Sequence, residues 1–309
     1  MRYLEAVFAV IVWGASFIAT KVALREVSPV TVVWLRFLMG VLILGAAVVL
    51  RREWKLPATW KEAGYFALLG FIGITFHQWL QSTGLVTAQA STTAWILATT
   101  PVFIALLGWL VLKEPLGAVR TAGIALAALG VLLVVSKGSL TSLAAGRAFS
   151  SGDLLILISA PNWAVFSVLS RQGLQRHPPA RMMFFVMAFG WLMSCGLFFG
   201  GPGLSEIPQL SLRGWLGIAF LGIFCSGLAY IAYYDALRAL PATQVGVFLN
   251  LEPLVALVVA AVVLGEAVLW TSLVGGAVIL LGVWLVNRPV DKEGNSKPVD
   301  RAIRQSGGS

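Results

Sequence analysis

The chain has 309 residues, of which 59% are hydrophobic and only 11% are charged. A soluble protein of this size could not bury so much apolar surface, so the composition excludes a soluble globular protein and indicates an integral membrane protein. The net charge of +9 does not indicate nucleic-acid binding, because the basic residues lie in loops between apolar runs. Cys195 and Cys225 lie inside such runs and predict neither a disulfide framework nor a metal site.

Ten apolar runs are long enough to cross a bilayer as helices. Those of the first half are expected at about 3–24, 31–50, 65–85, 91–112 and 118–136. Those of the second half are expected at about 152–171, 182–200, 215–235, 242–264 and 269–286. The sequence therefore predicts an all-α integral membrane protein with ten transmembrane helices.

The distribution of Lys and Arg predicts the orientation of these helices. With the N-terminus inside, sixteen of the 22 basic residues fall on the cytoplasmic side and five on the outer side, while Arg36 lies within a helix. Cytoplasmic loops of membrane proteins carry an excess of Lys and Arg. Both termini are therefore expected in the cytoplasm.

The chain contains two copies of one five-helix unit. A single shift aligns Pro101 with Pro253 and Glu114 with Glu266. We assign residues 1–137 to the first repeat, 138–151 to a linker, 152–287 to the second repeat and 288–309 to a disordered cytoplasmic tail. Because each copy has an odd number of helices, the second is expected to be inverted relative to the first. Secondary transporters use such inverted repeats, with the substrate site near the membrane midplane.

Several motifs resemble a known family. The run Trp13-Gly-Ala-Ser-Phe17, followed by Lys21, Pro29 and Arg36-Phe37, is similar to the opening of EamA-type transporters of the drug/metabolite transporter superfamily. The stretches 101–114 and 251–266 resemble the closing signature of each half of that family. The resemblance covers about residues 3–287 and implies ten helices, inverted topology and movement of small metabolites, most often export. It does not specify the substrate.

Polar side chains at equivalent places in the two repeats are candidates for a central site. Gln78 and Gln81 align with Tyr230 and Tyr233, and each pair shares one helix face. His77 neighbours this patch and titrates near neutral pH when unperturbed. The alternative is structural, because such groups also join membrane helices by hydrogen bonds.

Aromatic residues midway along two helices are further candidates. Trp13 and Trp163 are equivalent in the repeats, and Asn162 adds an amide beside Trp163. Phe17 shares the face of Trp13, and Trp95 is a weaker candidate. Aromatic side chains with a polar tip suit a pocket for amphipathic solutes such as amino acids or aromatic metabolites. The alternative is packing in the core of the bundle.

Glu252 is the carboxylate expected near the midplane. Ionisable residues inside a membrane span are costly, and they mark functional sites by default. Glu252 is a candidate proton carrier or a partner for a cationic part of the substrate, and the alternative is a structural carboxyl beside the kink at Pro253. Arg36 either snorkels outward or pairs with a carboxylate. Glu114 and Glu266 are expected to act at helix ends or in gating.

The sequence thus favours a secondary transporter of the plasma (inner) membrane that exports small metabolites, such as amino acids, by alternating access. The other function classes considered are a membrane-embedded enzyme and a transporter-like sensor or scaffold, and the chain contains no Walker, G-x-S-x-G or H-E-x-x-H motif. No catalytic residue, metal or cofactor is predicted. The expected partners are a small-molecule substrate and the lipid bilayer, with protons as a candidate coupling ion, and not nucleic acid. A monomer or weak dimer is expected.

Overall fold

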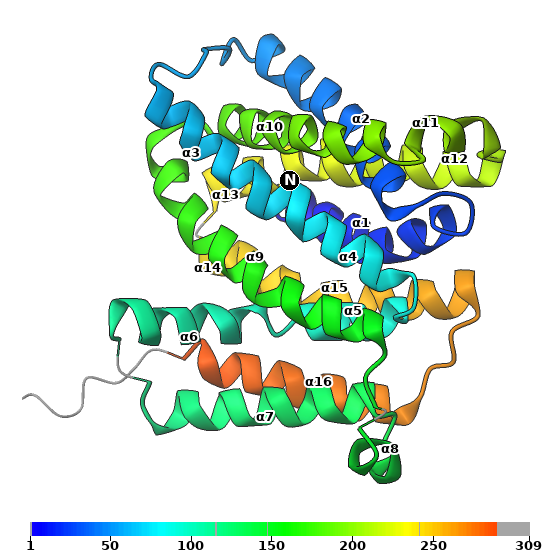
Figure 1. Cartoon of the computed structure of the whole chain (residues 1–309). Helices are drawn as coiled ribbons and strands as arrows, with labels where there is room; N and C mark the ends of the chain where they lie inside the picture. The colour runs from blue at the N-terminus through cyan, green and yellow to red at the C-terminus, as the bar shows by residue number, and fades with distance from the viewer. Residues whose placement is uncertain (1, 115, 147, 241, 289–309) are drawn as a thin grey trace, which may run out of the picture.

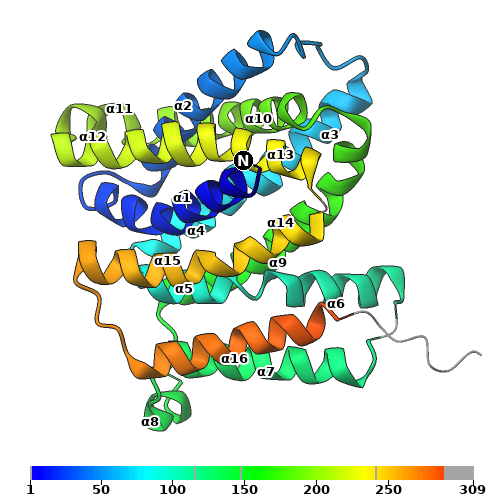
Figure 2. The same ribbon diagram turned by 180° about the vertical axis from the view of Figure 1, so that it is seen from behind.

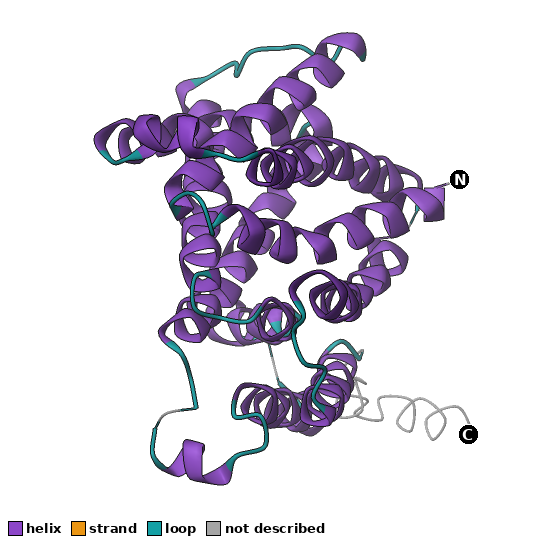
Figure 3. Ribbon diagram, turned by 90° about the vertical axis from the view of Figure 1, so that its right-hand side faces the viewer, coloured by secondary structure: helices purple, strands orange, loops and turns teal. Residues whose placement is uncertain are grey.

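The computed structural model describes residues 2–114, 116–146, 148–240 and 242–288. All regular structure in these residues is helical (Figure 3). The first half contains α1 (Arg2–Ala23), α2 (Pro29–Leu50), α3 (Trp60–Gly70), η1 (Phe71–Phe76), α4 (His77–Leu85), α5 (Ala90–Leu97), α6 (Thr100–Leu112), α7 (Ala118–Val135) and α8 (Leu140–Ala144). The second half contains α9 (Ser151–Arg176), α10 (Pro179–Gly200), α11 (Gly203–Glu206), η2 (Ile207–Gln209), α12 (Leu212–Ala219), η3 (Phe220–Leu228), α13 (Ala229–Ala239), α14 (Ala242–Phe248), η4 (Leu249–Leu251), α15 (Glu252–Val259), η5 (Ala260–Leu264) and α16 (Trp270–Val286).

The described residues form nine helices that are long and apolar enough to cross a membrane. A further apolar helix, Trp270–Val286, has 17 residues and spans about 25 Å at 1.5 Å per residue. These helices match the expected apolar runs to within a few residues at most ends. The segment expected to link the repeats contains the short helix α8. The expected tail lies, from residue 289 onward, outside the described residues.

The two halves interlock rather than lie side by side. Helix α1 packs on α12, η3, α13 and α15 of the second half, and α9 packs on η1, α4, α5 and α6 of the first half. Helices α2 and α10 pack together, as do α7 and α16. Figures 1 and 2 show the first of these pairs at the top of the view and the second at the bottom, with α1 and α9 between them. The first helix of each half therefore covers the third and fourth spans of the other half.

Glycines allow α7 and α16 to pack in backbone contact. A Cβ built on Gly123 would lie 2.7 Å from the carbonyl oxygen of Gly282, and one built on Gly130 would lie 2.7 Å from that of Gly275. Small residues permit such close approach between membrane helices. Gly123 and Gly275 occupy equivalent positions in the two repeats, as do Gly130 and Gly282. The crossing therefore has the symmetry expected of a repeated unit.

Both halves interrupt the same two spans. The third and eighth spans each contain a π-helical segment, η1 and η3. The fourth span breaks between α5 and α6, just before Pro101, and the ninth passes through the 3₁₀ segment η4 just before Pro253. Proline lacks the amide proton that the helix would use, so each break follows from the sequence. Candidate site residues adjoin three of these interruptions, since His77 and Gln78 follow η1, Tyr230 follows η3 and Glu252 follows η4.

Candidate functional site

Two of the expected site residues hydrogen-bond to the π-helical segments. The Nε1 of Trp13 donates to the carbonyl oxygen of Cys225 in η3 at 3.0 Å. In the other half, the Nδ2 of Asn162 donates to the carbonyl oxygen of Ile72 in η1 at 2.8 Å. A change from α to π bonding shifts the hydrogen-bond register, so a carbonyl becomes free for a neighbouring helix to satisfy. The polar groups of Trp13 and Asn162 thus hold the interrupted spans in place.

Aromatic rings around Trp13 form one wall of the centre. The ring centroid of Trp13 lies 5.5 Å from that of Tyr230 and 5.0 Å from that of Tyr233. The side chain of Tyr230 is buried, whereas Trp13 and Tyr233 are half-buried. These three residues come from α1 and α13. The structure therefore brings together, from opposite halves, the tryptophan and the tyrosine pair that the sequence singled out.

A smaller polar and aromatic group is formed by α4 of the first half and α9 of the second half. His77 stacks on Trp163 with centroids 4.7 Å apart. Its Nε2 lies 3.1 Å from the Nε2 of Gln81. His77 is buried in the bundle at 3% exposure, although Gln81 is half-buried. His77 and Gln81 therefore contact each other across one helical turn.

Arg36 joins this centre in a way that the sequence did not predict. Its side chain neither snorkels outward nor pairs with a carboxylate of the described residues, because it is 6% exposed and no acidic oxygen lies within 4.0 Å. Its Nε donates to the Oγ of Ser226 at 2.9 Å, and its Nη1 donates to the Oε1 of Gln78 at 3.0 Å. The guanidinium carbon also lies 5.0 Å from the ring centroid of Phe37. A charged residue inside an apolar run was the signal that could have identified Arg36.

Glu252 reaches the centre because α1 and α15 cross at Gly14. A Cβ built on Gly14 would lie 2.8 Å from both the carbonyl oxygen of Glu252 and the Cβ of Val255, so a larger residue would separate the helices. This crossing places the backbone of Glu252 beside Gly14, which follows Trp13 in α1. Glu252 is half-buried. Among the described residues its carboxylate has no ion-pair partner and accepts no side-chain or capping hydrogen bond.

Phe17 and Trp95 lie outside this group. Phe17 is 4% exposed and packs in an apolar cluster with Leu85 and Ala256. Trp95 is 1% exposed and belongs to the cluster that α7 and α16 help to form, with its ring against Gly276. Both side chains occupy packing positions in this conformation. The centre therefore consists of the remaining expected residues together with Arg36 and Ser226.

At one end of the bundle, Glu266 closes a contact among three spans. Its Oε1 accepts the amide of Ala90 at 2.8 Å, and its Oε2 accepts the amide and the Oγ of Ser91 at 3.1 and 2.7 Å. Helix α5 has no side-chain cap of its own, so Glu266 caps it from another span. The Nζ of Lys21 lies 3.9 Å from Glu266 and donates to the carbonyl oxygen of Ala88 at 2.5 Å.

The equivalent end of the other repeat is arranged differently. Glu114 and Arg171 correspond to Glu266 and Lys21, yet both are exposed and they form no ion pair with each other. Helix α5 packs on α1, α9 and α15, whereas the described part of α14 packs on α1 and α13 with little contact to α9. Equivalent elements are therefore engaged at the first end of the bundle and separated at the second.

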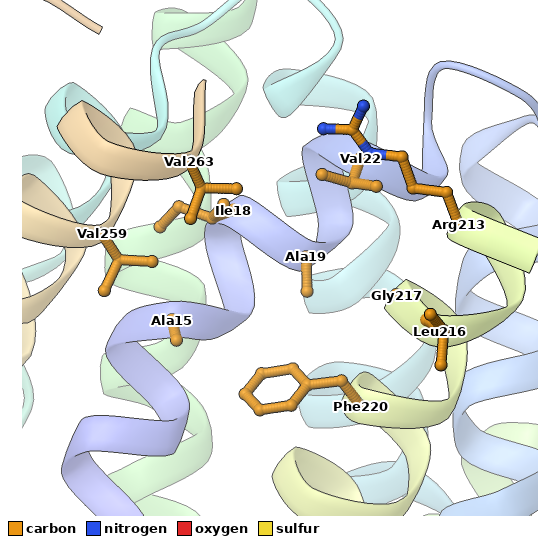
Figure 4. Close-up of a pocket in the computed structure, with 10 residues that line it drawn as sticks. All are labelled: Ala15, Ile18, Ala19, Val22, Arg213, Leu216, Gly217, Phe220, Val259 and Val263. Carbon is orange, nitrogen blue, oxygen red and sulfur yellow. The ribbon is translucent and has the colours of Figure 1, made fainter. Parts of the chain in front are cut away.

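An apolar groove of about 380 Å³ lies outside the polar centre. It runs between α1, α12, η3 and the end of the ninth span, and Arg213 is its one charged lining residue (Figure 4). Ile18, Phe220 and Val263 are among its apolar lining residues. The groove shares no residue with the polar centre. Among the described residues, no cluster of three His, Cys, Asp or Glu side chains could hold a metal ion.

Apolar spans, interlocked halves and charged side chains in the core are the features of a multi-pass membrane protein. The chain belongs to the EamA-like transporter family, whose family model matches residues 2–136 and 150–288. The family expected from the motifs is thereby confirmed.

The names of two relatives agree with this class. An "Uncharacterized transporter" of Archaeoglobus fulgidus is 28% identical over 285 residues, covering 92% of this chain and 96% of the relative. A "Probable amino-acid metabolite efflux pump" of Salmonella typhimurium is 28% identical over 287 residues, covering 91% of this chain and 92% of the relative. A solved crystal structure with 20% identity has a TM-score of 0.63 and covers 93% of this chain and 96% of its own. This structural likeness supports the fold alone.

Proposed function

We propose that the protein is a secondary transporter that exports small amphipathic metabolites, such as amino acids or related compounds. The observation that carries this proposal is the polar centre, where Arg36 and Glu252 lie among aromatic rings without a charged partner from the described residues. Charges are costly inside a membrane, and they mark substrate or ion pathways. The name of the Salmonella relative supports the same class of substrate.

Transport proceeds by alternating access between the two ends of the bundle. The contact at Glu266 holds one end closed, while its counterpart at Glu114 is open. Because the repeats are equivalent in sequence, the opposite conformation is obtained by exchanging these arrangements. Glu114 and Arg171 then take the places that Glu266 and Lys21 occupy here. The substrate site lies between the two contacts, as in other inverted-repeat transporters.

The topology follows from the basic residues of the loops. All ten spans, including Trp270–Val286, cross the plasma membrane, and both termini lie in the cytoplasm. The end that contains Glu114 then faces the cytoplasm, so the described conformation is open to the inside. An exporter in this state accepts its substrate from the cytoplasm. Protons are the coupling ion that we propose, with Glu252 as their carrier.

Counterflow in proteoliposomes tests the transport function. Purified protein is reconstituted with a mixture of radiolabelled amino acids outside and the same unlabelled amino acids in excess inside. We expect transient accumulation of label against its gradient, which neither a channel nor an enzyme produces. Liposomes without protein provide the blank, and those with Glu252→Gln are compared under an imposed pH gradient. The absence of counterflow for every amino acid and for a cytosolic metabolite extract would refute the proposed function.

A further inference from the structure

Arg36 keeps part of its guanidinium free for a ligand. The Nε and Nη1 atoms donate to Ser226 and Gln78, but Nη2 makes no hydrogen bond to the described residues. Ser226 and Gln78 fix the plane of the guanidinium from two different spans, η3 and α4. Because they are neutral, they leave its positive charge uncompensated. Such a preoriented guanidinium suits a carboxylate, which accepts charge-assisted hydrogen bonds from it.

Glu252 provides the opposite charge beside the same aromatic wall. The crossing at Gly14 sets the backbone of Glu252 beside Trp13, whose ring contacts Tyr230 and Tyr233. Ser226, which accepts the hydrogen bond from Arg36, lies one helical turn before Tyr230. Yet no ion pair joins Arg36 to Glu252, since their charged atoms are more than 4.0 Å apart. Arg36 and Glu252 thus approach the same aromatic group, Trp13 with Tyr230, from different helices.

A charge without a partner inside a membrane span is costly, and two opposite charges there would normally pair or be lost. Here they are held apart by α1, α2, α4 and α15, which fix their positions independently. A ligand that carries one negative and one positive group compensates both charges at once. The rings of Trp13, Tyr230 and Tyr233 offer an apolar surface for the rest of the ligand, and aromatic faces also attract an ammonium group.

We propose that Arg36 and Glu252 form a two-charge site for a zwitterionic amino acid. Arg36 binds the α-carboxylate, Glu252 binds the α-ammonium group, and the side chain of the amino acid lies against Trp13 and Tyr233. This inference rests on the proposed function and adds to it the residues that recognise the substrate. Substrates with a single charge leave one protein charge uncompensated, so the site discriminates against them.

Three probes that share a phenyl group test the assignment: L-phenylalanine, phenethylamine without the carboxylate, and 3-phenylpropionate without the ammonium group. Their binding to purified protein is measured by equilibrium competition for wild type, Arg36→Gln and Glu252→Gln. We expect wild type to bind L-phenylalanine at least tenfold more tightly than either single-charge probe. Arg36→Gln should lose this preference over phenethylamine, and Glu252→Gln should lose it over 3-phenylpropionate.

A structural role for the two charges gives a different pattern. If both variants weaken all three probes equally, or if wild type binds the three alike or not at all, the inference is overturned. Arg36→Lys, which keeps the charge, is a second variant at this position and should retain at least part of the preference over phenethylamine if the positive charge recognises the carboxylate. Monodisperse elution of each variant controls for folding. If the amino-acid mixture or the extract shows counterflow but wild type does not discriminate among the probes, only this inference is refuted. If there is no counterflow, the proposed function is refuted.

Discussion

Replacing Glu266 by alanine is expected to loosen the start of α5 and open the end of the bundle that is closed here. The carboxylate of Glu266 accepts three hydrogen bonds, from the amides of Ala90 and Ser91 and from the hydroxyl of Ser91. Its loss leaves the first turn of α5 without a side-chain cap, since Gln89 does not provide one. The first turn should therefore exchange its amide hydrogens more readily.

The size of the effect follows from these contacts. Loss of an N-cap costs about 0.5–2 kcal/mol, and hydrogen bonds to charged groups lie at about 1.5–3 kcal/mol each. Bonds that share one carboxylate are not additive, so we take about 2 kcal/mol for Glu266→Ala, which is about 30-fold in local opening. Glu266→Gln keeps one acceptor oxygen, and about 1 kcal/mol, or about fivefold, is expected.

Hydrogen–deuterium exchange of a peptide that covers residues 86–97 measures this opening directly. Glu114→Ala is the matched control, because Glu114 is the equivalent carboxylate but is exposed in this conformation. It should leave exchange of the 86–97 peptide unchanged. Equal exchange in wild type and Glu266→Ala would refute the capping role, and equal acceleration by both variants would refute the difference between the two ends.

Two further predictions concern stability. Gly130→Leu forces side-chain atoms against the backbone of Gly275, so the free energy of unfolding should fall by about 1–3 kcal/mol or more. Gly64→Ala is the control, because a Cβ at Gly64 meets nothing within 4 Å. It should raise the free energy of unfolding by up to about 1 kcal/mol. Thermal unfolding in detergent compares the two, and equal effects would contradict the packing at the α7–α16 crossing. In the loop after α1, hydrogen bonds from the hydroxyl and amide of Ser211 lower the pKa of Glu26, so its contribution to stability is present above its unfolded pKa and is lost as the pH falls through the lower folded pKa. The melting temperature of Glu26→Gln should lie below that of wild type at pH 7 and approach it as the pH falls through the lowered pKa of Glu26. A pH-independent difference would contradict the prediction.

The sequence was sufficient for the apolar spans, their approximate bounds and the family. A membrane span is a local property, because about 20 consecutive apolar residues satisfy their own backbone hydrogen bonds as a helix in lipid. The repeat was also visible, since Pro101 and Pro253 occupy equivalent positions and interrupt equivalent spans. The same local logic identified Glu252, whose charge stands out in an apolar run.

Only the tertiary structure decided which of these residues meet. The role of Arg36 depends on Ser226 and Gln78, which lie 190 and 42 residues away along the chain, and no local pattern encodes such contacts. Trp95 was a weaker candidate for the site, and its ring packs against α16 because Gly276 leaves room for it there. The difference between Glu266 and Glu114 is likewise invisible in equivalent sequences. It appears only in the tertiary structure, where Glu266 reaches the start of α5 while Glu114 is exposed.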